Sequence, residues 1–135
     1  QFIKSPKEYG EIKAAKSLGN FEIRSMGKGF PSEAGTGSLH ERAAKDAWGY
    51  FLSTMEKGVY GFVVLDEINI ALKYAYVDIG EVKGLLMDLK RFKGLVLTGR
   101  YADGSLYPYV DQILEMREIK HPYHKGIKAR RGIEF

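Results

Sequence analysis

The chain lacks cysteine altogether, although it is 135 residues long. This absence excludes a disulfide framework, a thiolate metal site and a cysteine nucleophile. Long apolar runs are also missing, so no segment has the length of a membrane span, and none resembles a secretory signal. These absences predict a cytoplasmic enzyme or binding domain that has no membrane partner.

Histidine is scarce as well, with three copies in the whole chain. They are not spaced with acids in a way that suggests a metal site, and no Ser-His-Asp arrangement is visible. What the chain has in quantity is apolar material, because 44% of its residues are hydrophobic and 13% are aromatic. This length and composition predict one domain, residues 1–135, with an ample core.

A phosphate-binding loop of the form G-x-x-x-x-G-K-[ST] is absent between Gln1 and Phe135. The absence is notable because the apolar run from Val63 to Leu65 ends in Asp66 and Glu67, a pattern typical of a strand that delivers acids to a magnesium nucleotide. Residues 1–4 already resemble the end of a strand, with no initiator methionine before them. We therefore expect that an amino-terminal segment carrying a phosphate-loop strand and helix is missing.

The net charge of +4 is concentrated near the carboxyl terminus, where five basic residues cluster: Lys120, Lys125, Lys128, Arg130 and Arg131. Without them, 16 basic residues stand against 17 acidic ones. A solvated, partly disordered terminus is one interpretation, and a nucleic-acid-binding arm is another. Glycines, a proline and aliphatic residues interrupt the charges, which favours a folded, turn-rich segment that binds a discrete polyanion such as triphosphate.

Apolar strands alternate with amphipathic helices along the sequence. We expect five strands, at residues 1–4, 21–26, 61–66, 95–98 and 112–116. We expect helices at 10–18, from a capping box of Ser38 and Glu41 to Gly58, from a capping pair of Asp78 and Glu81 to Leu89, and briefly after a Ser105 cap. The second helix should bury one stripe, made of Leu39, Ala43, Ala44, Ala47, Trp48, Phe51, Leu52 and Met55. This order predicts an α/β fold of three layers, with a mostly parallel sheet covered by helices on both faces.

In such a fold the ligand binds beyond the carboxyl ends of the strands, where three loops carry suggestive side chains. Asp66 and Glu67 could hold Mg²⁺ and a water, or they could only cap the following helix. Arg100 could bind phosphate oxygens, or it could form an ordinary salt bridge. Phe30, in a glycine-rich loop, could stack on a flat ligand, or it could belong to the core.

Several blocks of this sequence, in this order, resemble the P-loop type of corrinoid adenosyltransferases, which make adenosylcobalamin from ATP and a reduced corrinoid. The blocks span nearly the whole chain: residues 1–4, 10–11, 26–30, 63–72, 98–100, 115–117, 120–123 and 132–135. The Asp-Glu-Ile-Asn block that begins at Asp66 and the Gly-Ile-Glu-Phe ending are the most specific.

The resemblance implies a P-loop NTPase fold of the RecA-like kind and a reaction in which Co(I) attacks the 5′ carbon of ATP and triphosphate leaves. It implies that Asp66 and Glu67 hold Mg²⁺, that Phe30 and Gly29 contact the corrin, and that Arg100 neutralises charge on the leaving group. The ATP-binding residues that it implies are Glu11, Asn69, Arg100, His121, Lys125, Lys128 and Arg130. It further implies a homodimer and an electron-donating reductase or flavodoxin, and it gives nucleic acid no role.

The sequence departs from the family pattern at three places. The phosphate loop is absent, which predicts weak ATP binding and little turnover. Ser32 replaces a family tryptophan two positions after Phe30, and Arg130 replaces a glutamine of many relatives. Two alternatives stay open at this stage: a generic P-loop ATPase or nucleoside kinase, which has no need of Phe30, and a non-catalytic nucleic-acid-binding module that uses the basic tail.

Overall fold

The computed structural model describes residues 1–7, 10–30, 37–88, 93–130 and 132. They fall into two compact units, each described here by itself. The first unit comprises residues 1–7 and 23–110, and the second comprises residues 8–22 and 111–135. Ser32, Leu89, Arg131 and residues 133–135, which carry part of the sequence prediction, lie outside the described residues.

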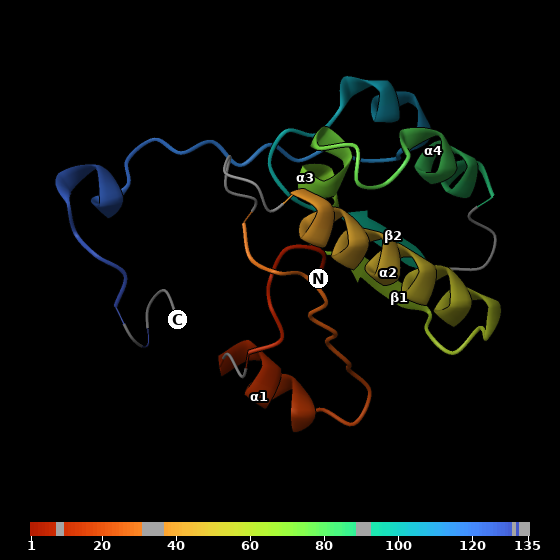
Figure 1. Ribbon diagram of the computed structural model, residues 1–135, viewed down its shortest axis with the longest axis horizontal. Helices are drawn as coiled ribbons and strands as arrows, with labels where there is room; N and C mark the ends of the chain where they lie inside the picture. Colours follow the sequence, from red (N-terminus) through yellow and green to blue (C-terminus); the bar gives the residue numbers. More distant parts are fainter. Residues whose placement is uncertain (8–9, 31–36, 89–92, 131, 133–135) are drawn as a thin grey trace. The chain divides into compact units, whose positions relative to one another are not determined.

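A parallel pair of strands forms the centre of the first unit (Figure 1). Strand β1, Phe62–Leu65, pairs with β2, Gly94–Leu97, so that Leu65 lies opposite Leu97. Helices α3, Ile68–Lys73, and α4, Ile79–Met87, connect them, as a parallel pair requires a crossover. The α/β class with a parallel sheet is thereby confirmed, and two strands are assigned among the residues that the structure describes.

The longest helix, α2, extends over Gly37–Glu56 and carries much of the core. Its buried residues are His40, Ala43, Ala44, Ala47, Trp48 and Phe51. Leu39 and Leu52 were also predicted to be in this stripe, but they are 60% and 37% exposed, because the buried face follows His40 and Ala44 instead. The helix also begins before Ser38, so the prediction that this serine precedes the first turn is wrong.

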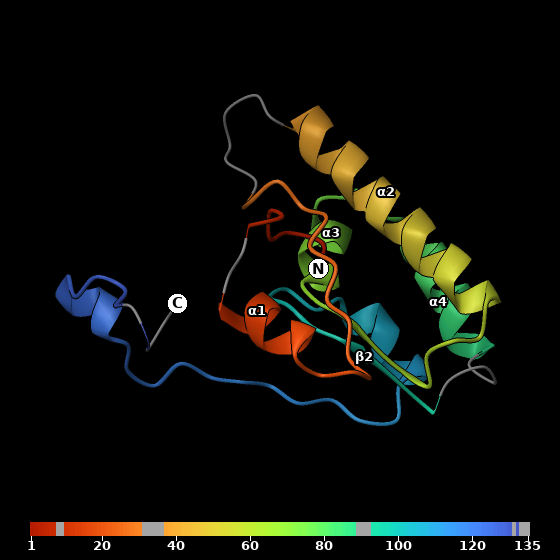
Figure 2. The same ribbon diagram turned by 90° about the horizontal axis from the view of Figure 1, so that it is seen from below.

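Helices α2 and α4 lie side by side in both views (Figure 1, Figure 2). The Trp48 indole nitrogen donates a hydrogen bond to Oε2 of Glu81 at 2.5 Å, which satisfies the buried polar edge of the ring. Asp78 caps α4 as predicted, since its Oδ1 accepts from the Glu81 amide at 3.0 Å. Glu81 thus contributes its carboxylate to the contact between the two helices and its backbone amide to the cap of α4.

The short 3₁₀ helix η2, Gly104–Tyr109, is capped by Asp103 rather than by Ser105 as predicted. Oδ1 of Asp103 accepts from the Ser105 amide at 2.8 Å. An aspartate side chain readily accepts a hydrogen bond from the amide two residues further along the chain. The cap residue is therefore Asp103, two positions before the predicted Ser105. Leu106 of η2 is buried and joins the core of the first unit.

Three segments that were predicted to be strands have no strand assignment: 1–4, 21–26 and 112–116. Residues 1–4 are nevertheless held by main-chain hydrogen bonds, from the Phe2 amide to the Asp66 carbonyl at 3.0 Å and from the Gly29 amide to the Ile3 carbonyl at 2.7 Å. These bonds go to two different neighbours, so they do not form a ladder. Phe2 and Ile3 are buried in the same core as Trp48 and Leu65.

The second unit contains α1, Gly10–Lys16, and a 3₁₀ helix, η3, Pro122–Lys125. α1 confirms the predicted helix at 10–18 within two residues. Within the described residues, no helix combines the length and the apolar character that a membrane crossing requires.

Gly27 provides a test of how residues 1–4 are seated. A Cβ at Gly27 would lie 2.2 Å from the carbonyl carbon of Ile3, whereas a Cβ at Gly49, within α2, would meet no atom within 4 Å. We expect Gly27→Ala to lower the free energy of unfolding by about 1–3 kcal/mol. Gly49→Ala should raise it by about 0.5–1 kcal/mol, since glycine weakens a helix interior.

Chemical denaturation of both variants measures these changes. A Gly27→Ala variant as stable as the parent chain would show that residues 1–4 do not pack against Gly27 in solution.

Candidate functional site

The candidate site lies where the paired strands end. Because Leu65 and Leu97 are partners in the register, the residues that follow them leave the sheet at the same edge. The Thr98 amide continues the pairing by donating to the Leu65 carbonyl at 3.2 Å. Asp66 and Glu67 are thus brought beside Thr98 and Gly99, as the sequence predicted for strand ends.

The Asp66 carboxylate is held by two side chains that are far away in the sequence. Its Oδ1 accepts from the Thr98 hydroxyl at 2.9 Å, and its Oδ2 accepts from the Gln1 side-chain amide at 3.1 Å. The Ser25 hydroxyl donates in turn to Oε1 of Gln1 at 2.5 Å. This chain of hydrogen bonds fixes the direction of the carboxylate, and sequence reasoning did not find Gln1, Ser25 or Thr98 as contributors.

Glu67, the residue after Asp66, has a strained backbone conformation. Its φ angle of 63° lies in the left-handed region, which residues with a side chain rarely adopt. Glu67 is the cap residue of α3, yet its side chain makes no capping hydrogen bond. Glu67 therefore occupies the cap position, but the interpretation that its carboxylate caps α3 is wrong.

The Glu67 carboxyl group is electrostatically unfavourable in its ionised form. Among the described residues, its Oε2 is buried without a hydrogen-bond partner. Burial raises the pKa of this carboxyl group most, the neighbouring Asp66 charge raises it further, and Arg100 and Lys4 oppose the increase. A cation that reached Oε2 would relieve both the burial and the repulsion.

Gly99 and Asn69 close this part of the site. Gly99 has a φ of 120°, and a Cβ there would lie 3.1 Å from Oε2 of Glu67. Asn69 is 6% exposed, and its side-chain amide donates to the Gly99 carbonyl at 3.2 Å. Asn69 thus ties α3 to the loop after β2, and its predicted contact with ATP stays a prediction.

Arg100 and Phe30 are both exposed. The Arg100 guanidinium lies near enough to Glu67 to lower the pKa of that carboxyl group. Phe30 is 69% exposed, so the alternative that it belongs to the core is wrong. Gly29 before it has a φ of 96°, which glycine adopts without strain. The predicted roles of Phe30 and Gly29 in corrinoid binding are not tested by this geometry.

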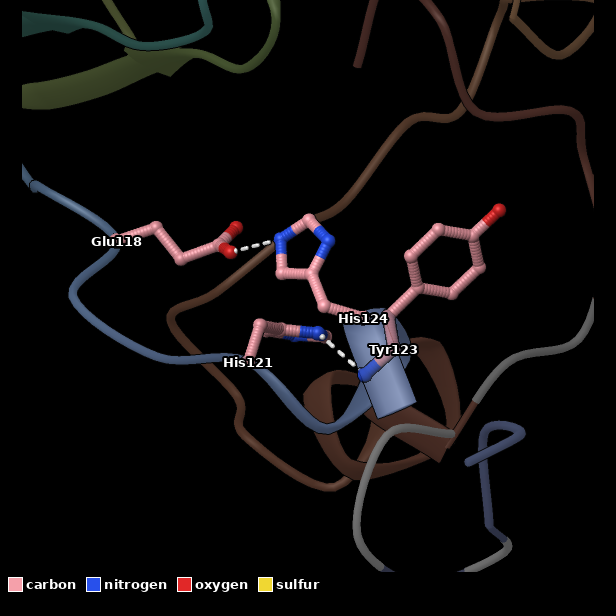
Figure 3. Close-up of polar contacts among 4 residues, drawn as sticks. All are labelled: Glu118, His121, Tyr123 and His124. Atoms are coloured by element: carbon pink, nitrogen blue, oxygen red, sulfur yellow. Dashed lines mark hydrogen bonds and ion pairs between the residues drawn. The ribbon is translucent and has the colours of Figure 1, made fainter. Parts of the chain in front are cut away.

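The other predicted ATP-binding residues belong to the second unit, namely Glu11, His121, Lys125, Lys128 and Arg130. Figure 3 shows how two histidines lie around η3. Nδ1 of His121 accepts from the Tyr123 amide at 3.1 Å, and Nε2 of His124 lies 2.5 Å from Oε1 of Glu118. The segment is turn-rich, as predicted, but the contribution of its basic residues to a site stays a prediction.

The donors present suit a hard cation such as Mg²⁺. Within the described residues, no group of three or more His, Cys, Asp or Glu side chains comes together. Mg²⁺ in nucleotide enzymes is held by one or two carboxylates and by the phosphates of the substrate. The oriented Asp66 carboxylate and the unpartnered Oε2 of Glu67 fit that pattern.

Replacing Glu67 by glutamine tests the electrostatic account. The pKa of Glu67 is raised in the folded state, so ionisation of this carboxyl group destabilises the folded chain. This loss of stability is absent below the ordinary glutamate pKa. It grows as the pH rises from that value through the pKa of the folded state. We expect Glu67→Gln to be more stable than the parent chain at pH 7 without divalent metal. The gain should vanish at acidic pH.

Thermal unfolding of both proteins at pH 4 and pH 7, in the presence of a chelator, measures the difference. A gain of equal size at both pH values would contradict the account, because it would not depend on ionisation.

The sequence of this chain is similar to those of known proteins. The sequence model of the family described as ATP:corrinoid adenosyltransferase BtuR/CobO/CobP matches residues 1–135. A corrinoid adenosyltransferase of Sinorhizobium sp is 38% identical over all of this chain and 64% of its own length. One from Pseudomonas aeruginosa is 32% identical, with 67% of its length covered.

A more distant relative is the corrinoid adenosyltransferase CobA of Salmonella typhimurium, which is 27% identical over all of this chain and 68% of its own length. The chain therefore spans about two thirds of the length of each of these three relatives. Since the family model matches from the first residue to the last, the chain belongs to the ATP:corrinoid adenosyltransferase family.

Proposed function

We propose that this chain is part of an enzyme that transfers the 5′-deoxyadenosyl group of ATP to Co(I) of a reduced corrinoid. The reaction releases triphosphate and belongs to adenosylcobalamin biosynthesis. The match of the family model to residues 1–135 supports the assignment. The observation that carries it in the structure is the meeting of Asp66, Glu67 and Arg100 at the ends of β1 and β2.

In this reaction the nucleophile belongs to a substrate. The electron pair of Co(I) forms the bond to the 5′ carbon, the bond from that carbon to the triphosphate oxygen breaks, and its electron pair leaves with triphosphate. The protein therefore needs to orient two substrates and to stabilise the leaving group. This requirement agrees with a chain that has no cysteine and no visible Ser-His-Asp arrangement.

Asp66 and Glu67 are the residues that would hold Mg²⁺ on the triphosphate. When bound, the cation supplies charge neutralisation for the phosphate oxygens. The Asp66 carboxylate contributes a fixed direction, since Thr98 and Gln1 both donate to it. Glu67 contributes an oxygen that has no partner among the described residues.

Other residues are proposed to bind the two substrates. Arg100 would neutralise charge on the leaving triphosphate. Four further residues are proposed to bind ATP, namely His121, Lys125, Lys128 and Arg130. Glu11 and Asn69 would lie at the edge of the ATP site. Phe30 and Gly29 would lie against the corrin, where an exposed ring can displace water from a flat ligand.

The proposal extends to the assembly around this chain. Residues 1–135 would form a single nucleotide- and corrinoid-binding domain of the RecA-like, three-layer P-loop type, completed by a phosphate loop. The enzyme would be cytoplasmic and homodimeric. An electron-donating reductase or flavodoxin would supply Co(I), because the reaction consumes that oxidation state.

The two other candidate functions are not favoured. A generic ATPase or nucleoside kinase would share Asp66 and Glu67, but the full-length family match points to corrinoid chemistry. A nucleic-acid-binding module would rest on the basic tail alone, and the carboxylates at the strand ends would have no role in it.

An anaerobic assay with reduced cobalamin and magnesium ATP tests the function. We expect a light-sensitive adenosylated product from the chain when a phosphate-loop segment is joined upstream, and little from residues 1–135 alone. Asp66→Asn in the extended protein should lower the efficiency with magnesium ATP by about 100-fold, since removing metal coordination costs several kcal/mol.

The visible spectrum reports the product directly. No product from the extended protein would contradict the assignment, and full activity of Asp66→Asn would remove Asp66 from the metal site.

Phe30 separates corrinoid binding from ATP binding. We expect Phe30→Ala to raise the KM for cobalamin by up to about tenfold, because an aromatic contact contributes about 0.5–1.5 kcal/mol. The affinity for ATP should be unchanged. Phe21→Ala is a matched control, since Phe21 is also exposed, at 54%, and lies outside the predicted site.

Initial rates at varied cobalamin and varied ATP give both constants. A large loss of ATP affinity with normal corrinoid use would place Phe30 in the nucleotide site instead.

A further inference from the structure

One hydroxyl group serves two residues of the proposed metal site. We propose that Thr98 is a positioning residue for Asp66 and Glu67, and that it sets how tightly the site binds Mg²⁺ with ATP. The inference rests on the proposed function, because it concerns the same carboxylates. Thr98 itself would touch neither the cation nor the substrates.

The direction of the two hydrogen bonds follows from the donors available. The Glu67 amide donates to Oγ1 of Thr98 at 3.0 Å. Oγ1 therefore uses its own proton toward Oδ1 of Asp66, at 2.9 Å. A hydroxyl has one proton to donate and can accept at the same time, so both bonds form together.

The main chain of Thr98 prevents this hydroxyl from moving away. Its amide donates to the Leu65 carbonyl at 3.2 Å, and its carbonyl accepts from the Asn69 amide at 3.2 Å. Threonine is also branched at Cβ, which limits its side-chain rotamers. Each polar group of Thr98 thus bonds to the segment from Leu65 to Asn69.

The bond to Glu67 supports an unfavourable backbone. Glu67 has a φ of 63°, and its amide has Thr98 Oγ1 as its partner. This conformation leaves Oε2 of Glu67 buried near Gly99, without a partner among the described residues. Without the Thr98 hydroxyl, the amide of Glu67 would lose this bond, and the turn could relax.

The bond to Asp66 sets the carboxylate plane. Thr98 donates to Oδ1 and Gln1 to Oδ2, so each oxygen keeps lone pairs free for a further contact. Residues that orient a metal ligand in this way influence affinity without touching the metal. Thr98 therefore acts through both carboxylates at once.

Substitutions of matched shape separate the hydroxyl from the packing. Thr98→Val keeps the branched shape and removes both hydrogen bonds, whereas Thr98→Ser keeps the hydroxyl. Thr54→Val is the control, because Thr54 is a partly buried threonine of α2 whose hydroxyl donates to the Tyr50 carbonyl in its own helix. All variants are made in the phosphate-loop-extended protein.

Calorimetric titration of ATP at a series of Mg²⁺ concentrations, without corrinoid, measures the coupling of the cation to nucleotide binding. We expect Thr98→Val to need about 10- to 100-fold more Mg²⁺ for half-maximal ATP affinity. Thr98→Ser should stay within about threefold of the parent protein, and Thr54→Val should not differ from it. ATP affinity without Mg²⁺ should be the same for all four proteins.

An unchanged Mg²⁺ requirement in folded Thr98→Val would overturn the inference. If that variant does not fold, Thr98→Cys replaces it, since a thiol is a weak donor. Thr98→Cys should need more Mg²⁺ than Thr98→Ser, and equality of the two would equally overturn the inference.

The adenosylation assay distinguishes this inference from the function on which it rests. A parent protein that makes no adenosylated product, but whose Mg²⁺-dependent ATP binding is weakened by Thr98→Val, would reject the function and keep the positioning role. If Thr98→Val forms product normally at the Mg²⁺ concentration that the parent protein needs, the function is kept and the positioning role of Thr98 is rejected.

Discussion

The hydrogen bond from the Thr98 hydroxyl to the Asp66 carboxylate joins the ends of two paired strands. Because the register places Leu65 opposite Leu97, the chain leaves both strands at the same edge of the sheet. The bond then holds together the residues that follow the two strands. The same hydroxyl accepts from the Glu67 amide. Helix α3 begins at Ile68, directly after Asp66 and Glu67. Both of these residues are hydrogen-bonded to Thr98, which follows β2. Gln1 and Ser25 extend the network on the other side of Asp66.

This arrangement is costly unless something binds to it. Two adjacent carboxylates repel each other, Glu67 is partly desolvated, and its backbone adopts a left-handed conformation. A divalent cation with phosphate oxygens would offset the first two of these costs. Arg100 offsets part of the charge, as its effect on the pKa of Glu67 indicates. This cost is consistent with the proposal that a charged ligand binds at Asp66 and Glu67.

Local patterns of the sequence predicted the parts that depend on local physics. The apolar runs before Asp66 and Thr98 predicted both strands and their shared edge, and the Asp78 cap predicted the start of α4. The partners of the carboxylates could not be predicted in this way, because Gln1 and Asp66 are 65 positions apart and Thr98 and Asp66 are 32 apart. Strands expected at 1–4 and 112–116 failed for a related reason, since a strand needs a partner that its own sequence does not specify.

A double-mutant cycle on Asp66 and Thr98 tests the central claim most directly. The free energies of unfolding of Asp66→Ala, Thr98→Val and the double variant are measured against the parent chain by chemical denaturation without metal. If the hydrogen bond joins the strand ends as described, the two residues should be coupled by about 1–3 kcal/mol. Additive effects, with a coupling below about 0.5 kcal/mol, would contradict the account.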